Sequence, residues 1–167
     1  MKITNRKFFD VRADILAPKL LGKYLCRNIN GDVKRYKITE VEAYMGEADT
    51  ACHSHKGKTK RTAPMYEQSG TIYVYLCYGI HSLLNIVCGG NNPEAVLIRG
   101  VEGYSGPGRV SKVLAINKEL NGQDIINSTD LWLEEAKDIK TYKTATRIGI
   151  DYAEDKDKNA LLRYFID

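Results

Sequence analysis

Short runs of strand-forming residues, joined by turn residues, are the feature that most constrains this chain. The runs are Lys23 to Ile29, Lys34 to Tyr44, Thr71 to Tyr78, Leu83 to Cys88 and Ala95 to Val101. Asn30-Gly31-Asp32 separates the first two with a turn of the Asn-Gly kind, and Gly79 marks a bend between the next two. Short strands with tight connections predict a sheet that is mostly antiparallel.

Helical patterns are fewer and shorter than the strand patterns. The first is expected between Phe8 and Leu21, with Asp14 as its N-cap and Gly22 as its stop, and the second from about Gly108 to Asn117. Further short pieces are expected at 131–133 and 147–150, with a final strand at 162–166. With 167 residues the chain is long enough for one core, so we predict a single α+β domain over 1–167, with a curved sheet and flanking helices.

Composition excludes several classes of protein. Hydrophobic residues make up 43% and charged residues 28%, which is ordinary for a globular domain. The absence of a long apolar run and of a signal-like amino terminus predicts no membrane partner and no secretion. Four scattered cysteines without a CxxC motif predict reduced thiols, neither a disulfide framework nor a zinc site of the four-cysteine type.

The stretch Ile38 to Tyr44, followed by His53, brings acidic, aromatic and imidazole groups together. On a β-strand the period of two would place Ile38, Glu40, Glu42 and Tyr44 on one face. Such a face could hold a planar ring and perform acid/base chemistry on it. The alternative is that Glu40 and Glu42 simply face water on a half-exposed strand.

The basic and the tyrosine-rich segments can each be interpreted in two ways, as parts of a binding site or as ordinary surface and core structure. The net charge is +4, and Lys56 to Arg61 forms a basic loop that could neutralise phosphates or be an ordinary solvated loop. The chain has eleven Tyr. Alternation places Tyr73 and Tyr75 on one strand face and Tyr78 at the bend, where rings could stack on bases or pack in the core.

Seven blocks of the sequence resemble, in order and spacing, the alkyladenine DNA glycosylases, also called 3-methyladenine or methylpurine DNA glycosylases. The blocks are Glu42-Ala43-Tyr44, Ala51-Cys52-His53-Ser54, Gly70 to Gly79, Asn85-Ile86, Val96 to Arg99, Gly106-Pro107-Gly108 and Leu114 to Asn117. Several independent blocks in register are much harder to obtain by chance than one motif. The resemblance runs from about Phe8 to Phe165, nearly the whole chain.

The resemblance implies a monofunctional base-excision repair enzyme that binds double-stranded DNA. It would flip a damaged purine out of the duplex with a protruding, DNA-inserting β-hairpin. The damaged base would be 3-methyladenine, 7-methylguanine, hypoxanthine or ethenoadenine, and hydrolysis of its N-glycosidic bond would leave an abasic site. The implied enzyme is a monomer that needs no cofactor or metal, and works in the bacterial cytoplasm at the nucleoid or in the eukaryotic nucleus.

The resemblance also implies roles for individual residues. Glu42 would activate the attacking water, with Glu40 as its competitor for that role; Arg99 would position the water or a phosphate, and the backbone carbonyl of Ile148 would complete the water's shell. The base pocket would be formed by Tyr44, His53, Tyr75, Asn85 and Leu97. Tyr78 would fill the gap left by the flipped base.

Weaker assignments follow from the same resemblance. Met65 would be a second apolar wedge, although core packing is an equal alternative for a lone methionine. Phosphate contacts would come from Lys58, Thr59, Arg61 and Arg109.

The sequence departs from the family pattern in three places. The connection between Val101 and Gly106 is short, His81 stands where an aromatic ring is common, and Cys52 replaces a small apolar residue. These departures bear on substrate range rather than on the type of reaction.

Two rival interpretations remain. The first is a catalytically silent module that binds nucleic acid and uses Glu42 only for structure. The second is a zinc site at Cys52-His53-Ser54-His55, for which the sequence lacks a second ligand pair at suitable spacing.

Overall fold

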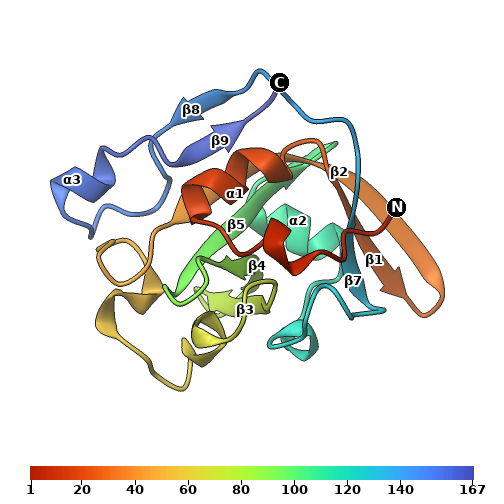
Figure 1. Cartoon of the computed structure of the whole chain (residues 1–167), viewed down its shortest axis with the longest axis horizontal. Helices are drawn as coiled ribbons and strands as arrows, with labels where there is room; N and C mark the ends of the chain where they lie inside the picture. The colour runs from red at the N-terminus through yellow and green to blue at the C-terminus, as the bar shows by residue number, and fades with distance from the viewer.

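A nine-stranded antiparallel sheet organises the chain, and the computed structural model describes all residues from 1 to 167 (Figure 1). The main path runs in the order β3-β4-β5-β2-β1-β7, with β6 beside β5 and the pair β8-β9 joined to β2. The strands are β1 Tyr24–Ile29, β2 Asp32–Tyr44, β3 Ile72–Cys77, β4 His81–Cys88, β5 Glu94–Val101, β6 Tyr104–Ser105, β7 Leu131–Glu134, β8 Lys143–Ala145 and β9 Arg163–Phe165. The predicted α+β class with a curled antiparallel sheet is confirmed.

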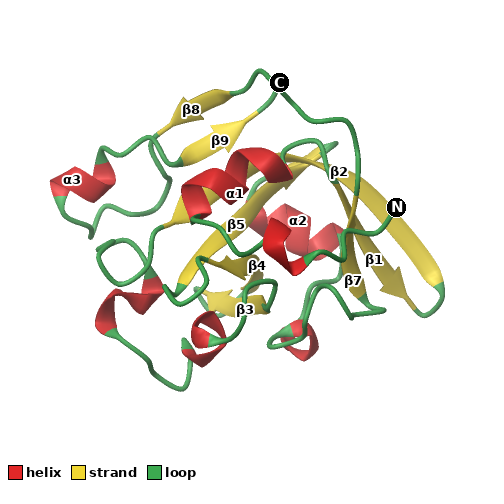
Figure 2. Cartoon of the chain, viewed as in Figure 1, coloured by secondary structure: helices red, strands yellow, loops and turns green.

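Helices are few and short beside the sheet (Figure 2). The α-helices are α1 Ala13–Leu20, α2 Pro107–Val113 and α3 Asp155–Lys158, and the 3-10 turns are Arg6–Phe8, His53–Lys56, Ala63–Tyr66 and Lys118–Leu120. Side chains of α1 and α2 meet the sheet in one core cluster of 27 buried residues. Strand and helix therefore share a single core, which gives the sheet a rigid backing.

The first helix starts two residues earlier than the predicted cap implies, with Arg12 in place of Asp14 at the N-cap. Asp14 lies inside the first turn of α1 and not at its N-cap. The free N–H of Ala13 is instead bound by the buried carboxylate of Glu94, at 2.8 Å, from a position 81 residues away in the chain. A long-range carboxylate thus replaces the local cap that the sequence indicated.

The second helix ends at Val113, four residues before the predicted Asn117. Ala115 adopts φ +46°, and the N–H of Ile116 closes the end by donating to the carbonyl of Ser111 at 2.8 Å. The buried Arg27 side chain then donates to the carbonyl of Leu114 at 3.0 Å. These interactions stop the helix although the apolar pattern continues.

Both predicted hairpins are present. Asn30 and Gly31 have φ of 52° and 89°, as the turn between β1 and β2 requires. Between β3 and β4 the residues Cys77 and His81 pair, and Tyr78 stands at the tip with 91% of its surface exposed. The tip is therefore free to contact a partner, and insertion into DNA remains a prediction.

The carboxyl-terminal segment returns to the centre of the sheet. β9 pairs with β2 at Glu40, Val41 and Glu42, so this late strand lies directly beside the acidic residues singled out above. The predicted piece at 147–150 is a loop with no regular element, and it follows β8 immediately. This arrangement brings Ile148 close to Glu42.

Candidate active site

A β-bulge in β2 decides which side chains share the face of Glu42. The pairing of β2 with β5 shifts between Ile38 and Glu40 and shifts back by Val41. Ile38 consequently joins Val41 in the main core, so the predicted common face of Ile38 and Glu42 is wrong. An extra residue in one strand reverses the alternation, which a strict period of two cannot anticipate.

Gly100 lies opposite the bulge. A Cβ built at this position would lie 3.0 Å from the hydroxyl oxygen of Thr39 and 3.2 Å from the Cβ of Glu40. A side chain at this position would therefore push Thr39 or Glu40 away by a few tenths of an ångström, so glycine favours the close approach of β5 to the bulged strand.

Glu42 is a fully buried carboxylate with several favourable contacts. Its side chain is 0% exposed. The Tyr44 hydroxyl donates to Oε1 at 2.8 Å, and the backbone N–H of Ile148 donates to Oε2 at 2.7 Å. Arg99 Nη1 lies 3.8 Å from Oε1. The resemblance assigns the carbonyl of Ile148 to the attacking water, which stays a prediction, and the structure adds a contact from the N–H of the same residue to Glu42.

Opposing effects act on the pKa of Glu42. Burial is the largest, and it raises the pKa above its ordinary value. The charge of Arg99, the hydrogen bonds from Ile148 and Tyr44, and the charge of Arg147 all lower it, in that order of size. The net result is a raised pKa, which is the property of a carboxylate that can accept a proton.

Glu40 has a different environment. Its carboxylate accepts a hydrogen bond from Arg163 Nη1 at 2.9 Å and lies 3.6 Å from Arg99 Nε. Unlike Glu42, it makes its hydrogen bond and ion pairs with Arg163 and Arg99 and none with residues 147–150. Glu40 is therefore suited to holding Arg99 in place, and Glu42 is the better placed of the two for chemistry.

A cavity of about 390 Å³ lies in front of the Glu42 carboxylate. Glu42 itself is covered by Tyr44, Arg99 and Ile148, which line the cavity wall. Most residues selected from the sequence line this cavity: Tyr44, His53, Arg61, Met65, Tyr75, Tyr78, Asn85, Leu97, Arg99 and Ile148. The volume lies within the range of sites that bind small organic groups.

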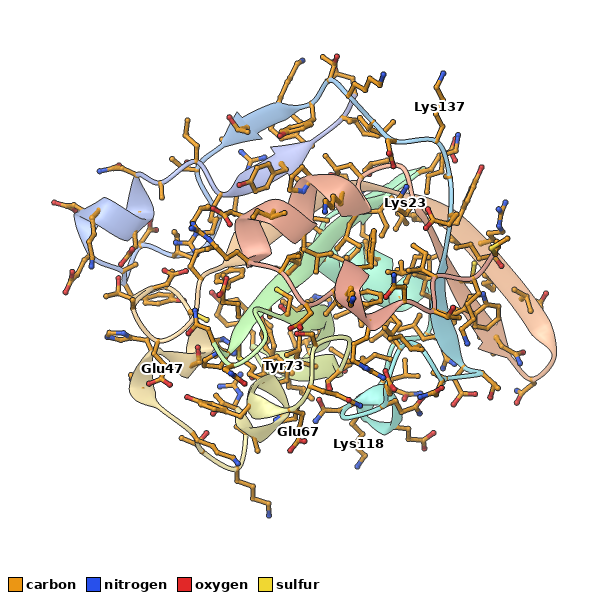
Figure 3. The ribbon with its side chains drawn as sticks, in the orientation of Figure 1. Lys23, Glu47, Glu67, Tyr73, Lys118 and Lys137 are labelled. Carbon is orange, nitrogen blue, oxygen red and sulfur yellow. The ribbon has the colours of Figure 1, made fainter.

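Aromatic rings form one side of the cavity. The His53 ring lies 4.3 Å from that of Tyr75 and 6.0 Å from that of Tyr73, centroid to centroid. His53 Nδ1 and the Tyr73 hydroxyl are 3.0 Å apart. Tyr73, labelled in Figure 3, lies on the β3–β4 side of the molecule and is almost fully buried. Tyr73 thus supports His53, while Tyr44 and Tyr75 are available as ring-stacking surfaces.

His53 is neutral at physiological pH. Burial, with a smaller effect from the charge of Arg61, lowers its pKa from 6.5 to about 4. Between pH 6.5 and about 4 this histidine is therefore protonated in the unfolded chain and neutral in the folded chain. The free energy of unfolding consequently decreases as the pH falls through this window.

Replacing His53 by Gln is expected to flatten this dependence. Unfolding in denaturant, measured at several pH values between 7 and 4, should show a smaller loss of stability below pH 6.5 for His53→Gln than for the parent. Identical slopes in the two proteins would mean that His53 accepts a proton in the folded state.

Met65, which lines the cavity, and Arg109, which does not, have different surroundings. Met65 is only 2% exposed and packs with Tyr73 and Cys52 in a small core cluster, which is the packing alternative considered for it. Arg109 is exposed on α2, where it lines a separate hollow with Glu40 and Tyr104.

Within the basic loop, side chains differ in their contacts. Thr59 is tied to Thr62, whose hydroxyl oxygen accepts from the Thr59 N–H at 2.9 Å. Lys58 Nζ lies 5.9 Å from the Tyr66 ring centroid. Arg61 lies 5.5 Å from the Tyr75 ring centroid and donates to the carbonyl of Leu76 at 3.2 Å. Arg61 therefore stands at the cavity mouth as well as on the loop.

The structure also shows the surroundings of the three departures from the family pattern. Cys52 is buried beside His53, with its Sγ 3.2 Å from the Ser54 hydroxyl oxygen. His81 lies against α2, since a Cβ at Gly108 would be 3.0 Å from His81 Nδ1. Residues 102–103 make a tight turn that pairs Val101 with Tyr104.

The sequence did not indicate the partner of Arg147. Its guanidinium is buried against Asp49, 98 positions away. Tyr152, also not anticipated, lines the cavity. Neither position carries a local pattern that marks it, because both acquire their surroundings only when the segment 147–152 packs against residues 43–51.

One structural absence concerns the zinc interpretation. The structure contains no group of three or more His, Cys, Asp or Glu side chains arranged to hold a metal ion. It also contains no helix with the length and apolar character needed to cross a membrane.

Comparison with known proteins decides the family. A sequence model described as Methylpurine-DNA glycosylase matches residues 7–105 and 102–167. The chain belongs to the methylpurine-DNA glycosylase family. The resemblance drawn from the sequence blocks is thereby confirmed. The match to the methylpurine-DNA glycosylase model divides at residues 102–105, where the connection is short in this chain.

Individual relatives align over most of both chains. A protein of Natranaerobius thermophilus is 39% identical, covering 96% of this chain and 93% of the relative. A Borreliella afzelii protein is 41% identical, covering 98% and 95%. One from Psychrobacter cryohalolentis is 40% identical, covering 90% and 85%. Each is named "Putative 3-methyladenine DNA glycosylase".

Proposed function

We propose that this methylpurine-DNA glycosylase is monofunctional and hydrolyses the N-glycosidic bond of alkylated or deaminated purines with a water activated by Glu42. The observation that carries this proposal is the Glu42 carboxylate, fully buried directly behind an aromatic cavity. A charge taken out of water costs free energy, and a binding module has no use for an anion near phosphates. A catalytic base explains its presence.

In the proposed reaction a water molecule attacks C1′ of the flipped nucleotide. Its oxygen forms the new bond to C1′, its proton passes to Glu42, and the C1′–N9 bond breaks with its electrons leaving on the base. The negative charge of Glu42 stabilises the positive charge that develops on the sugar. Tyr44 and the Ile148 N–H orient the carboxylate, and Arg99 positions the water or an adjacent phosphate.

The cavity would select the base. Tyr44 and Tyr75 would stack on its two faces, which favours cationic bases such as 3-methyladenine and 7-methylguanine. Neutral His53 would hydrogen-bond the purine edge, and Asn85, at the buried end of the cavity, would collide with the amine of normal guanine. Hypoxanthine and ethenoadenine, being neutral, need a proton to leave.

The surface around the cavity would hold duplex DNA. Lys58, Thr59, Arg61 and Arg109 would contact phosphates. Tyr78, exposed at the tip of the β3–β4 hairpin, would occupy the space vacated by the flipped base. We propose that the enzyme acts as a monomer where chromosomal DNA lies, at the nucleoid in a bacterium or in the nucleus of a eukaryote.

Single-turnover base release tests the proposal. The purified protein, in excess over duplex DNA and with a chelator present, should release 3-methyladenine or hypoxanthine and leave an undamaged duplex intact. Released bases are separated by chromatography, and abasic sites are revealed by alkaline strand cleavage. Tight binding of damaged duplex without any release would instead identify a silent binding module.

A further inference from the structure

A buried ion pair holds the loop that contacts Glu42. The Arg147 side chain is 0% exposed and that of Asp49 is 3% exposed. Two parallel hydrogen bonds join them, from Nη1 to Oδ2 at 2.5 Å and from Nη2 to Oδ1 at 3.0 Å. A bidentate pair of this kind fixes direction as well as distance.

The same guanidinium contacts the backbone on both sides of the site. Nη1 donates to the carbonyl of Ala43 at 3.1 Å, and Nη2 donates to the carbonyl of Asp157 at 3.2 Å. The guanidinium carbon also lies 4.9 Å from the Tyr44 ring centroid. Arg147 therefore touches the residue that follows Glu42 and the ring whose hydroxyl binds Glu42.

Near the carboxylate the loop is held by the Arg147 ion pair, by a hydrogen bond from Arg163 to the carbonyl of Thr146, and by the buried Ile150. Ile148 leaves 51% of its surface exposed, so core burial does not hold it. Gly149 has φ +77°, a conformation that any other residue would adopt with strain. The Ile148 N–H thus reaches Glu42 at 2.7 Å from a loop that is held directly before it by the Arg147 ion pair and two positions after it by the buried Ile150.

Fold stability alone does not account for this pair. Replacing a buried ion pair by apolar residues of similar volume is often neutral or stabilising. Arg147 Nε moreover has no hydrogen-bond partner, which adds a cost to its burial. The geometry around Glu42 supplies a reason for keeping the charges.

We propose that Arg147 and Asp49 are positioning residues for the reaction. The ion pair holds the Ile148 N–H and the Tyr44 ring against the Glu42 carboxylate, so that the base stays ionised and correctly oriented. This inference rests on the function proposed above.

A change in this pair should appear in the titration of Glu42. The charged and titratable groups that act on its carboxylate come from separate elements: Tyr44 of β2, Arg99 of β5, Arg147 of the loop, Tyr75 of β3 and Tyr152. Of these, Arg147 lowers the pKa of Glu42, and so does the hydrogen bond from Ile148. Loss of both raises it. Since the base must be deprotonated, activity in acid would fall.

The test compares two variants with the parent. Arg147→Lys keeps the positive charge but cannot make the bidentate contact. The double variant Arg147→Met with Asp49→Asn removes both charges, so no uncompensated charge is left in the interior. Lys143→Met is the matched control, because Lys143 lies four residues before Arg147, on β8, and forms an exposed ion pair with Asp167.

Two quantities are measured for each folded variant. The first is the single-turnover rate of base release between pH 5 and 8, and the second is the carboxyl carbon resonance of Glu42, assigned by its loss in Glu42→Gln. The double variant should be at least about tenfold slower than the parent at pH 6, because its Glu42 would be both less ionised and less well oriented. Arg147→Lys should fall between it and the parent, and Lys143→Met should match the parent.

The two proposals can fail separately. A parent-like pH profile and Glu42 titration in both folded variants would overturn the positioning role. If the parent releases no base, the proposed function fails, yet the carboxyl resonance still reports whether Arg147 and Asp49 set the state of Glu42. If the double variant does not fold, the proposal is tested with Arg147→Lys alone, since this variant keeps the buried positive charge.

Discussion

Replacing Glu42 by Gln is expected to lower the single-turnover rate of base release by about 10²- to 10⁴-fold, the usual contribution of a general base. Glutamine keeps the size of the side chain, but it cannot take a proton from water or stabilise positive charge on the sugar. Its oxygen can still accept one hydrogen bond, so the fold should persist. The measurement is release of 3-methyladenine and hypoxanthine from duplex DNA with enzyme in excess.

The neighbouring acid provides the control for this substitution. Glu40→Gln leaves Glu42 in place and weakens only the contacts to Arg163 and Arg99. It should reduce the rate far less than Glu42→Gln. Equal rates for Glu42→Gln and the parent would move the catalytic role to Glu40 or to another group.

Replacing Tyr78 by Ala is expected to weaken excision about 5- to 150-fold, because one aromatic ring stacked on a base contributes about 1–3 kcal/mol. Tyr78 is 91% exposed and makes no core contact, so thermal unfolding should be nearly unchanged. It is also held at φ +53°, which costs a residue with a Cβ about 1–2 kcal/mol. A large exposed ring in a strained backbone conformation favours a role in binding.

Two other substitutions at the hairpin separate the possible causes of such an effect. Tyr78→Phe keeps the ring and should excise bases at nearly the parent rate. Ile80→Ala removes an exposed apolar side chain beside the tip, and it should have a smaller effect than Tyr78→Ala. Excision that is unaffected by Tyr78→Ala would remove the wedge assignment.

Strand positions and turns were well predicted from sequence because their causes are local. Asn30-Gly31 supplies the two positive φ angles that a two-residue hairpin needs, and it does so without help from distant residues. β3, β4 and β5 likewise begin and end within two residues of their predicted bounds.

Errors arose where a distant group replaced a local one. Glu94 caps α1 instead of Asp14, and Arg27 helps to end α2 before its apolar pattern ends. The bulge opposite Gly100 moved Ile38 to the core face. Each of these depends on a neighbour that no window of adjacent residues contains.

The sequence by itself determined the antiparallel sheet, the family and many of the residues that line the cavity, since alternation, turn chemistry and ordered blocks are all properties of the linear chain. Only the tertiary structure decided how Glu42 is held. Its Ile148 contact spans 106 positions, and the Arg147–Asp49 pair beside it spans 98. A buried charge is tolerable only where compensating donors converge, and convergence of distant segments is a property of packing rather than of local propensity.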